Sequence, residues 1–150
     1  MKLSETISPK RINLNLSATT RNGILEELVG LLQLKPPARK ALLKTLQARE
    51  ELGSTAVGNG IAIPHCRSLV VGEVLVAVGR SSRGISFRAP DKKRVRLFFL
   101  IVAPPLGDPG DYLITLGSVA QAARPLAEDK RLKAVTTPQQ FIHLLEEIEE

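Results

Sequence analysis

A nearly uninterrupted apolar run from residue 95 to residue 102 constrains the fold of this 150-residue chain more than any other feature. The run is V-R-L-F-F-L-I-V, and Pro104 and Pro105 follow it closely. A strand that is apolar on both sides must be covered on both faces of its sheet, so helices have to pack above and below it. The run is too short to cross a bilayer and contains Arg96. It therefore predicts a central strand in a sheet flanked by helices.

The other apolar spacings predict short strands and helices around this run. Ile12, Leu14 and Leu16 alternate with asparagines, which is the pattern of a half-buried strand. Further strands are expected at 61–63 and 74–78, and helices are expected after Thr19 or Thr20, from Pro36 and Pro37, near 111–123, and after a capping box at Thr137 and Gln140. Because no repeat or linker interrupts the pattern, residues 1–150 are expected to form one α/β domain, a single mixed β-sheet flanked by α-helices.

The net charge of +6 arises from 21 Lys and Arg against 15 Asp and Glu. A nucleic-acid partner is not expected, because the basic residues are dispersed and only four Phe and one Tyr could serve as stacking platforms. The densest basic cluster, D-K-K-R-V-R at 91–96, is interpreted as a turn that leads into the long strand. The basic surface instead favours association with acidic protein partners.

Cysteine usage and the start of the chain bear on its location. Cys66 is the only cysteine, so the chain cannot form an internal disulfide, which fits a reducing compartment. The opening M-K-L-S-E-T has no apolar signal region behind its lysine. Together with the absence of a long apolar run, these features predict a cytoplasmic protein without stable membrane insertion.

The segment 49–67, R-E-E-L-G-S-T-A-V-G-N-G-I-A-I-P-H-C-R, carries the strongest functional signal. It presents His65 directly after Pro64, whose ring fixes one backbone angle and so helps to aim the next side chain. A neutral imidazole is a good nucleophile near neutral pH. His65 is therefore the main candidate for chemistry in this chain.

Several groups near His65 in the sequence suit a phosphoryl group. They are the guanidinium of Arg49, the hydroxyls of Ser54 and Thr55, and the backbone N–H groups of a loop formed by Gly58, Asn59 and Gly60. Each of these features alone is ordinarily structural: a solvated helix end, a helix cap or a tight turn. Their combination favours phosphoryl transfer, which depends mainly on positioning and electrostatic stabilisation.

The string R-E-x-L-G-S-T-x-x-G-N-G-I-A-I-P-H closely resembles the phosphohistidine signature of enzyme IIA proteins of the phosphotransferase system, of the fructose/mannitol and nitrogen-regulatory type (EIIA type 2). The opening I-N-L-N-L and the strand end V-A-P-P support the resemblance. It implies the mixed α/β fold of the mannitol-specific IIA protein, a phosphoryl-accepting His65 with Nε2 as the phosphorylated atom, and roles in the site for Arg49, Ser54 and Thr55. No metal or organic cofactor is implied.

The resemblance also implies partners. The phosphoryl group would come from a histidine-containing phosphocarrier protein (HPr/NPr-like) and would pass to an enzyme IIB or be sensed by a regulated target protein. Many family members carry a second histidine at the start of the helix after the long strand. Here the residues are Asp111, Tyr112 and Leu113, so Tyr112 is the candidate substitute at that second position.

Two other kinds of site are not expected around His65, namely a cysteine nucleophile and a metal site. Cys66 has no separate His–Asp pair to activate it as a nucleophile. His65, Cys66 and His143 lack the spacing of metal ligands, and His143 is interpreted as a core or surface residue.

Two functional hypotheses therefore stay open beside phosphoryl transfer to a permease. The first is a phosphorylatable regulator of the nitrogen-regulatory kind, favoured by Tyr112 and by the lack of a fused transport domain in this chain. The second is a degenerate module of the same fold that binds partners without transferring phosphate. A nucleic-acid binder, supported only by the charge, would show strongly salt-dependent retention on nucleic acid.

Overall fold

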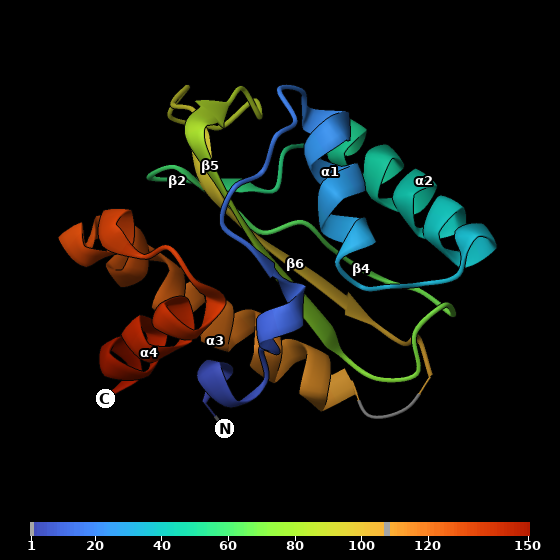
Figure 1. Cartoon of the computed structure of the whole chain (residues 1–150). Coiled ribbons are helices and arrows are strands. Elements are labelled where there is room, and N and C mark those ends of the chain that lie inside the picture. Colours follow the sequence, from blue (N-terminus) through green and yellow to red (C-terminus); the bar gives the residue numbers. More distant parts are fainter. Residues whose placement is uncertain (1, 107–108) are drawn as a thin grey trace.

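A mixed sheet lies between two helical layers in the computed structural model, which describes residues 2–106 and 109–150 (Figure 1). The strand order is β1-β5-β6-β3-β2, and β4 also pairs with β6. The strands are β1 (Ile12–Asn13), β2 (Ala56–Gly58), β3 (Ile61–Ala62), β4 (His65–Arg67), β5 (Leu75–Ile85) and β6 (Val95–Ala103). The pairs β5–β6 and β2–β3 are antiparallel, whereas β1–β5, β3–β6 and β4–β6 are parallel. The predicted mixed sheet is confirmed.

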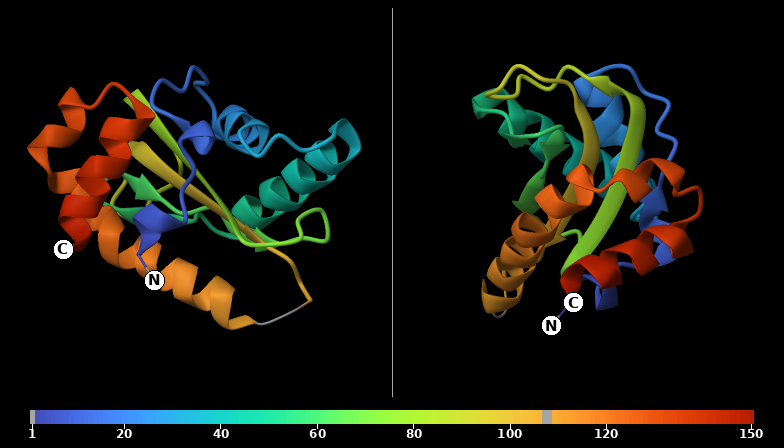
Figure 2. Two further views of the ribbon diagram at one scale, coloured as in Figure 1. Left: turned by 60° about the horizontal axis from the view of Figure 1, so that its bottom comes forward. Right: turned by 90° about the vertical axis from the view of Figure 1, so that its left-hand side faces the viewer.

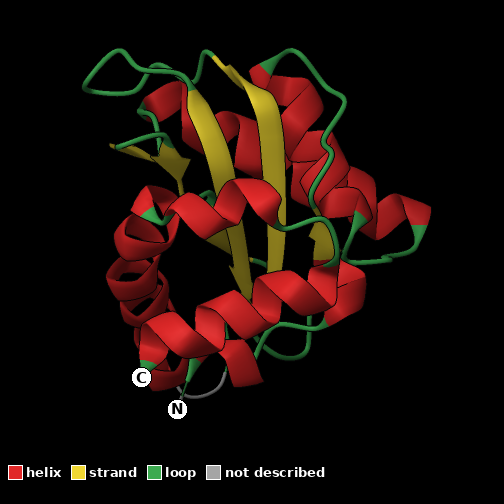
Figure 3. Ribbon diagram, turned by 60° about the vertical axis from the view of Figure 1, so that its left-hand side comes forward, coloured by secondary structure: helices red, strands yellow, loops and turns green. Residues whose placement is uncertain are grey.

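The helices are distributed over the two faces of this sheet, as the turned views in Figures 2 and 3 show. The α-helices are α1 (Arg21–Gly30), α2 (Pro36–Leu52), α3 (Pro109–Glu128) and α4 (Pro138–Glu149), and the 3₁₀ helices are η1 (Leu3–Glu5), η2 (Pro9–Arg11) and η3 (Lys130–Ala134). Helices α1 and α2 pack on one face, and α3, α4 and η1 pack on the other. Among the described residues, no helix is long and apolar enough to cross a membrane.

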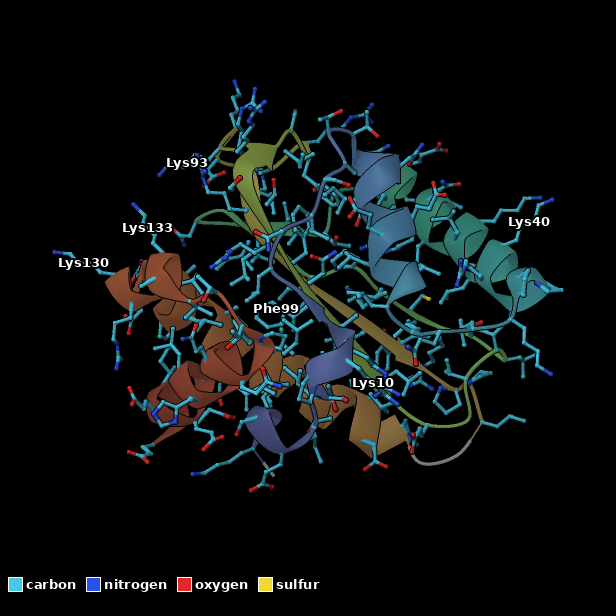
Figure 4. The ribbon with its side chains drawn as sticks, in the orientation of Figure 1. Lys10, Lys40, Lys93, Phe99, Lys130 and Lys133 are labelled. Carbon is cyan, nitrogen blue, oxygen red and sulfur yellow. The ribbon has the colours of Figure 1, made fainter. Side chains whose placement is uncertain are left out.

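Strand β6 is buried on both faces, as its sequence predicts. Its side chains alternate between two apolar clusters because successive residues of a strand point to opposite sides. Leu97, Phe99 and Ile101 join the cluster under α3 and α4, and Phe98, Leu100 and Val102 join the cluster under α1 and α2. Phe99, labelled in Figure 4, is fully buried. The lysines labelled in that figure project from η2, α2, η3 and the loop before β6, in line with a dispersed basic surface.

Three predicted helix starts are confirmed, two by their caps and one by its proline, whereas the helix expected near 111–123 is α3, which begins earlier, at Pro109. Thr20 is the residue that caps α1, because its hydroxyl accepts a hydrogen bond from the backbone N–H of Gly23 at 3.1 Å. Thr137 and Gln140 form the full capping box at the start of α4. Pro36 occupies the first turn of α2. These local rules hold because a helix start depends on only a few neighbouring residues.

Strand lengths are predicted less well than helix starts. The strand expected at 12–16 ends at Asn13, whose side-chain oxygen accepts a hydrogen bond from the N–H of Asn15 at 2.9 Å. This local turn bends the chain, so that Leu14 and Leu16 enter opposite apolar clusters. In contrast, β5 extends from Leu75 to Ile85, well beyond the expected 74–78, because its pairing with β6 continues through Arg80 and, after an irregularity, resumes at Ile85.

Candidate functional site

The segment 61–67 is one extended run along β6, interrupted only at residues 63–64. Strands β3 and β4 pair with β6 in the same parallel register, since Ile61 lies opposite Leu97 and His65 opposite Ile101, 36 residues apart in each case. Pro64 has no N–H to donate, but its carbonyl accepts a hydrogen bond from the N–H of Ile101 at 2.9 Å. The predicted histidine after a short strand therefore lies at the start of a further strand, β4, which the sequence did not predict.

The imidazole of His65 is half-buried, and one hydrogen bond determines its tautomer. Its Nδ1 atom lies 2.6 Å from the carbonyl oxygen of Ile63. A carbonyl oxygen can only accept, so Nδ1 must carry the proton of the neutral ring. The lone pair then resides on Nε2, for which the structure records no partner among the described residues. The ring is thus oriented and presents Nε2 as its nucleophilic atom.

Arg49 and Glu50 lie in the last turn of α2, on the approach to the site. Arg49 donates from Nη1 to the carbonyl oxygen of Gly53 at 2.8 Å. Glu50 is almost completely buried, and its carboxylate accepts hydrogen bonds from the backbone N–H of Thr55, at 3.1 Å, and from the Thr55 hydroxyl. The sequence placed Glu50 in the motif without a role, and the structure makes it the anchor of the segment after α2.

The two predicted hydroxyls are both engaged within the protein. The Thr55 hydroxyl donates to Glu50, and the Ser54 hydroxyl donates to the carbonyl oxygen of Phe87 at 2.5 Å. Ser54 also accepts a hydrogen bond from the N–H of Ala56 at 3.0 Å. These bonds hold the segment between α2 and β2 against the rest of the fold. In this structure, both side chains therefore position that segment.

The structure does not bring the loop of Gly58, Asn59 and Gly60 together with His65. All three residues have positive φ angles (90°, 57° and 78°), as a tight turn between β2 and β3 requires. Gly60 precedes His65 by five residues of nearly extended chain, about 16 Å. The N–H of Asn59 donates to the carboxylate of Asp91 at 3.0 Å, and backbone N–H groups of Lys93 and Asn59 hold the pKa of Asp91 below its usual value.

Tyr112 lies in the first turn of α3, close to His65. The two ring centroids are 6.5 Å apart. Burial raises the pKa of Tyr112, and nearby Cys66 raises it further, whereas Arg67 and Arg49 act in the opposite direction. A phenol that stays protonated near neutral pH therefore lies beside the imidazole.

Arg67 is a residue of the site that sequence reasoning missed. Its Cζ atom lies 5.0 Å from the centroid of the Tyr112 ring, a cation–π distance. The available signal was the i, i+2 spacing from His65, which places both side chains on one face of a strand. That signal could be used only once residues 65–67 were known to form a strand.

Neither Cys66 nor His143 has the surroundings of a catalytic residue. Burial raises the pKa of the Cys66 thiol to about 11, so the thiolate is scarce near neutral pH. His143 is exposed on α4, and its Nε2 lies 3.2 Å from a carboxylate oxygen of Glu147. Within residues 2–106 and 109–150, no group of three or more His, Cys, Asp or Glu side chains could hold a metal ion.

The surface around His65 offers apolar side chains for contact with another molecule. Four largely exposed leucines follow or adjoin the segments that form the site, namely Leu52 after Arg49, Leu69 after β4, Leu106 after β6 and Leu113 beside Tyr112. A cavity of about 700 Å³ lies elsewhere, beside the turn between β2 and β3. Its lining includes Gly60, Arg80 and Lys133 but not His65. At the candidate site itself, His65 is half-buried and Arg67 is exposed.

The fold and the site define a class of α/β protein in which a hydrogen bond orients one half-buried imidazole at the edge of a mixed sheet. The chain belongs to the family described as "Phosphoenolpyruvate-dependent sugar phosphotransferase system, EIIA 2", which it matches over residues 5–148. The resemblance noted in the motif is thereby confirmed for nearly the whole chain.

Three comparisons place the chain within this family. It is 31% identical to a "Nitrogen regulatory protein" of Bradyrhizobium diazoefficiens over 146 residues, which cover 97% of this chain and 95% of the relative. It is 36% identical over 131 residues to a "PTS system fructose-specific EIIA component" of Haloferax volcanii, covering 85% and 83% of the two chains. The crystal structure of nitrogen regulatory protein IIA-Ntr from Neisseria meningitidis superposes with a TM-score of 0.83 at 28% identity, covering 95% and 98% of the two chains.

Proposed function

We propose that this protein is a phosphoryl carrier and regulator of the phosphoenolpyruvate-dependent phosphotransferase system, and that Nε2 of His65 accepts the phosphoryl group. The observation that carries this proposal is the hydrogen bond from Nδ1 to the carbonyl oxygen of Ile63, which reserves the lone pair of Nε2 for chemistry on an accessible surface. The family membership supports the same reaction.

The transfer is an in-line substitution at phosphorus. The Nε2 lone pair of His65 forms a new N–P bond while the N–P bond of the donor phosphohistidine breaks. The electron pair of the broken bond returns to the donor ring, whose other nitrogen keeps its proton, so the donor leaves as a neutral imidazole. His65 retains its Nδ1 proton against Ile63 and becomes a phosphorylated imidazolium.

The residues around His65 supply position and charge. Arg49 provides a guanidinium near the site, with Nη1 already held by Gly53. Glu50, Thr55 and Ser54 hold the segment after α2 in place. The loop at Gly58, Asn59 and Gly60 contributes the turn that sets the direction of β3, rather than a contact with the phosphoryl group. No cofactor is required, because phosphoryl transfer between imidazoles depends on alignment and electrostatics.

The proposed donor is a histidine-containing phosphocarrier protein (HPr/NPr-like), and the proposed recipient is an enzyme IIB or a regulated target protein. The four exposed leucines near the site give a partner an apolar contact area. The net charge of +6 favours acidic partners through their association rate. One relative that matches nearly end to end is a nitrogen regulatory protein, which supports the regulatory branch. We place the protein in the cytoplasm, where its single unpaired cysteine would stay reduced.

The test is phosphoryl transfer from phosphoenolpyruvate through enzyme I and the phosphocarrier, measured by intact mass under mildly basic conditions. One acid-labile phosphoryl group is expected on the native protein and on His143→Ala, and none on His65→Ala. His143→Ala is the matched control, since it removes the other histidine, which is exposed on α4. Full labelling of His65→Ala would refute the proposal. An unlabelled native protein beside a verified carrier would refute it in favour of a module that binds without transfer.

A further inference from the structure

We propose that Arg67 is a second cation that holds the phosphoryl group on His65, and that Tyr112 is the platform that positions it. This inference rests on the proposed function. It concerns a residue outside the motif that first identified the site, and it follows from the way β4 and α3 pack against each other.

The first step is the alternation of side chains along the extended segment 61–67. Ile61 and Ile63 belong to the apolar cluster under α3 and α4, whereas Ala62 and Cys66 pack against the cluster under α1 and α2. Because side chains alternate along an extended chain, the odd-numbered residues face α3. His65 and Arg67 therefore point to the same side as α3, about 7 Å apart along the strand.

The second step is the contact of both side chains with one ring. The Tyr112 ring is buried and sits on the first turn of α3, with its centroid 6.5 Å from the His65 ring and 5.0 Å from Cζ of Arg67. A guanidinium over an aromatic face gains a cation–π interaction and loses little hydration. The ring thus fixes Arg67 beside the imidazole without consuming its N–H groups.

The third step is the availability of those N–H groups. Within the described part of the chain, the Arg67 side chain forms neither an ion pair nor a hydrogen bond, and it contacts the ring of Tyr112. Arg49 differs, since one of its nitrogens already donates to Gly53. Arg67 is exposed, so its guanidinium N–H groups can donate to a ligand from solution.

The fourth step is charge. A phosphoryl group on His65 brings about −1.5 to −2 charges to this surface. Arg67 and Arg49 are both close enough to Tyr112 to favour its ionised form, so the two cations approach the ring from β4 and α2. A phosphoryl group on Nε2 then lies near both, and Arg67 can bind two of its oxygens with a planar fork. Burial keeps the Tyr112 phenol protonated and able to donate as well.

The experiment measures single-turnover transfer from the phosphorylated carrier over a range of carrier concentrations. Arg67→Gln is expected to lower the rate at saturating carrier by about ten- to a hundredfold, the range for losing a hydrogen-bonded charge. Arg67→Lys, which keeps the charge without the fork, should lose less. Arg83→Gln is the matched control, because it removes an exposed cation from β5 at the end of the sheet away from His65 and should change the rate less than about threefold.

The role of Tyr112 is tested by its variants and by their coupling to Arg67. Tyr112→Phe keeps the aromatic face and should retain most of the rate, whereas Tyr112→Leu should lose most of the contribution of Arg67. If Tyr112 acts through Arg67, the double variant Arg67→Gln/Tyr112→Leu should be no slower than the slower single variant. Urea unfolding of each variant checks that the fold is retained.

The outcomes separate this inference from the proposed function. Labelling of the native protein with equal rates for Arg67→Gln and Arg83→Gln would overturn the role of Arg67 and leave His65 as the acceptor. An effect of Arg67→Gln confined to the carrier concentration for half-maximal rate would also overturn it, because that result assigns Arg67 to docking. Absence of labelling on the native protein would instead remove the proposed function itself.

Discussion

Replacement of Thr55 by valine tests whether the segment before the site depends on a buried carboxylate. Thr55 supplies Glu50 with two hydrogen bonds, one from its N–H at 3.1 Å and one from its hydroxyl. Thr55→Val keeps the first bond, removes the second and leaves a methyl group against a carboxylate that is 2% exposed. A hydrogen bond to a charged group is worth about 1.5–3 kcal/mol, so the free energy of unfolding should fall by about 2 kcal/mol.

The assay is urea unfolding, with the slope expected to stay unchanged because the surface exposed on unfolding is the same. For a domain of this size, the corresponding decrease in Tm is about 4–8 °C. Thr115→Val is the matched control: Thr115 is equally buried, but its hydroxyl donates only to the carbonyl oxygen of Asp111 within α3, at 2.8 Å. Its loss should be below about 1 kcal/mol.

The result that would refute this reasoning is a Thr55→Val variant no less stable than Thr115→Val. A second readout addresses the chemistry. Because the Thr55 hydroxyl is committed to Glu50, Thr55→Val should still accept a phosphoryl group on His65 at a rate within a few fold of the native protein well below its Tm. A loss of labelling in a variant that is fully folded would mean that the hydroxyl contacts the phosphoryl group.

Three further predictions concern single positions. Burial raises the pKa of the Cys66 thiol to about 11, so alkylation of this thiol by iodoacetamide should be slow at pH 7.5. The rate should rise about tenfold per pH unit up to that pKa and should be much higher in urea. Fast alkylation of the native protein at pH 7.5 would contradict this prediction. Thr137→Ala removes the capping box shared with Gln140 and should cost about 1 kcal/mol in urea unfolding, whereas an unchanged midpoint would show that α4 does not need its cap. Gly79→Ala places a methyl group 2.6 Å from Cδ1 of Leu16 and should cost about 1–3 kcal/mol, and a stability gain would contradict this close packing.

The accuracy of the sequence-based expectations depended on the range of the interactions behind them. The cap of α4 and the proline that opens α2 were predicted correctly, and the cap of α1 was predicted to within two neighbouring threonines, because each involves neighbours within one helical turn. The early end of β1 at Asn13 was missed, although its cause is a local turn, because the apolar alternation continues through Leu14 and Leu16. A period of two shows that side chains alternate and does not show where hydrogen bonding stops.

Pro64 illustrates the same limit at the site itself. A proline suggests the end of a strand, yet the pairing with β6 resumes at His65 in the register that began at Ile61. The resumed strand is the reason that Arg67 shares a face with His65. Sequence proximity likewise brought the Gly58–Gly60 loop into the predicted site, while five extended residues separate Gly60 from His65 in space.

The sequence by itself determined the class of fold, the helix starts and the identity of the one histidine suited to chemistry, because these follow from short-range periodicity and from a contiguous motif. Only the tertiary structure decided which nitrogen of His65 is free, that Glu50 holds the segment after α2, and that Tyr112 meets both His65 and Arg67. The physical reason is that the parallel register of β4 on β6 and the packing of α3 join residues 45 positions apart, from Arg67 to Tyr112, and no local pattern contains that contact.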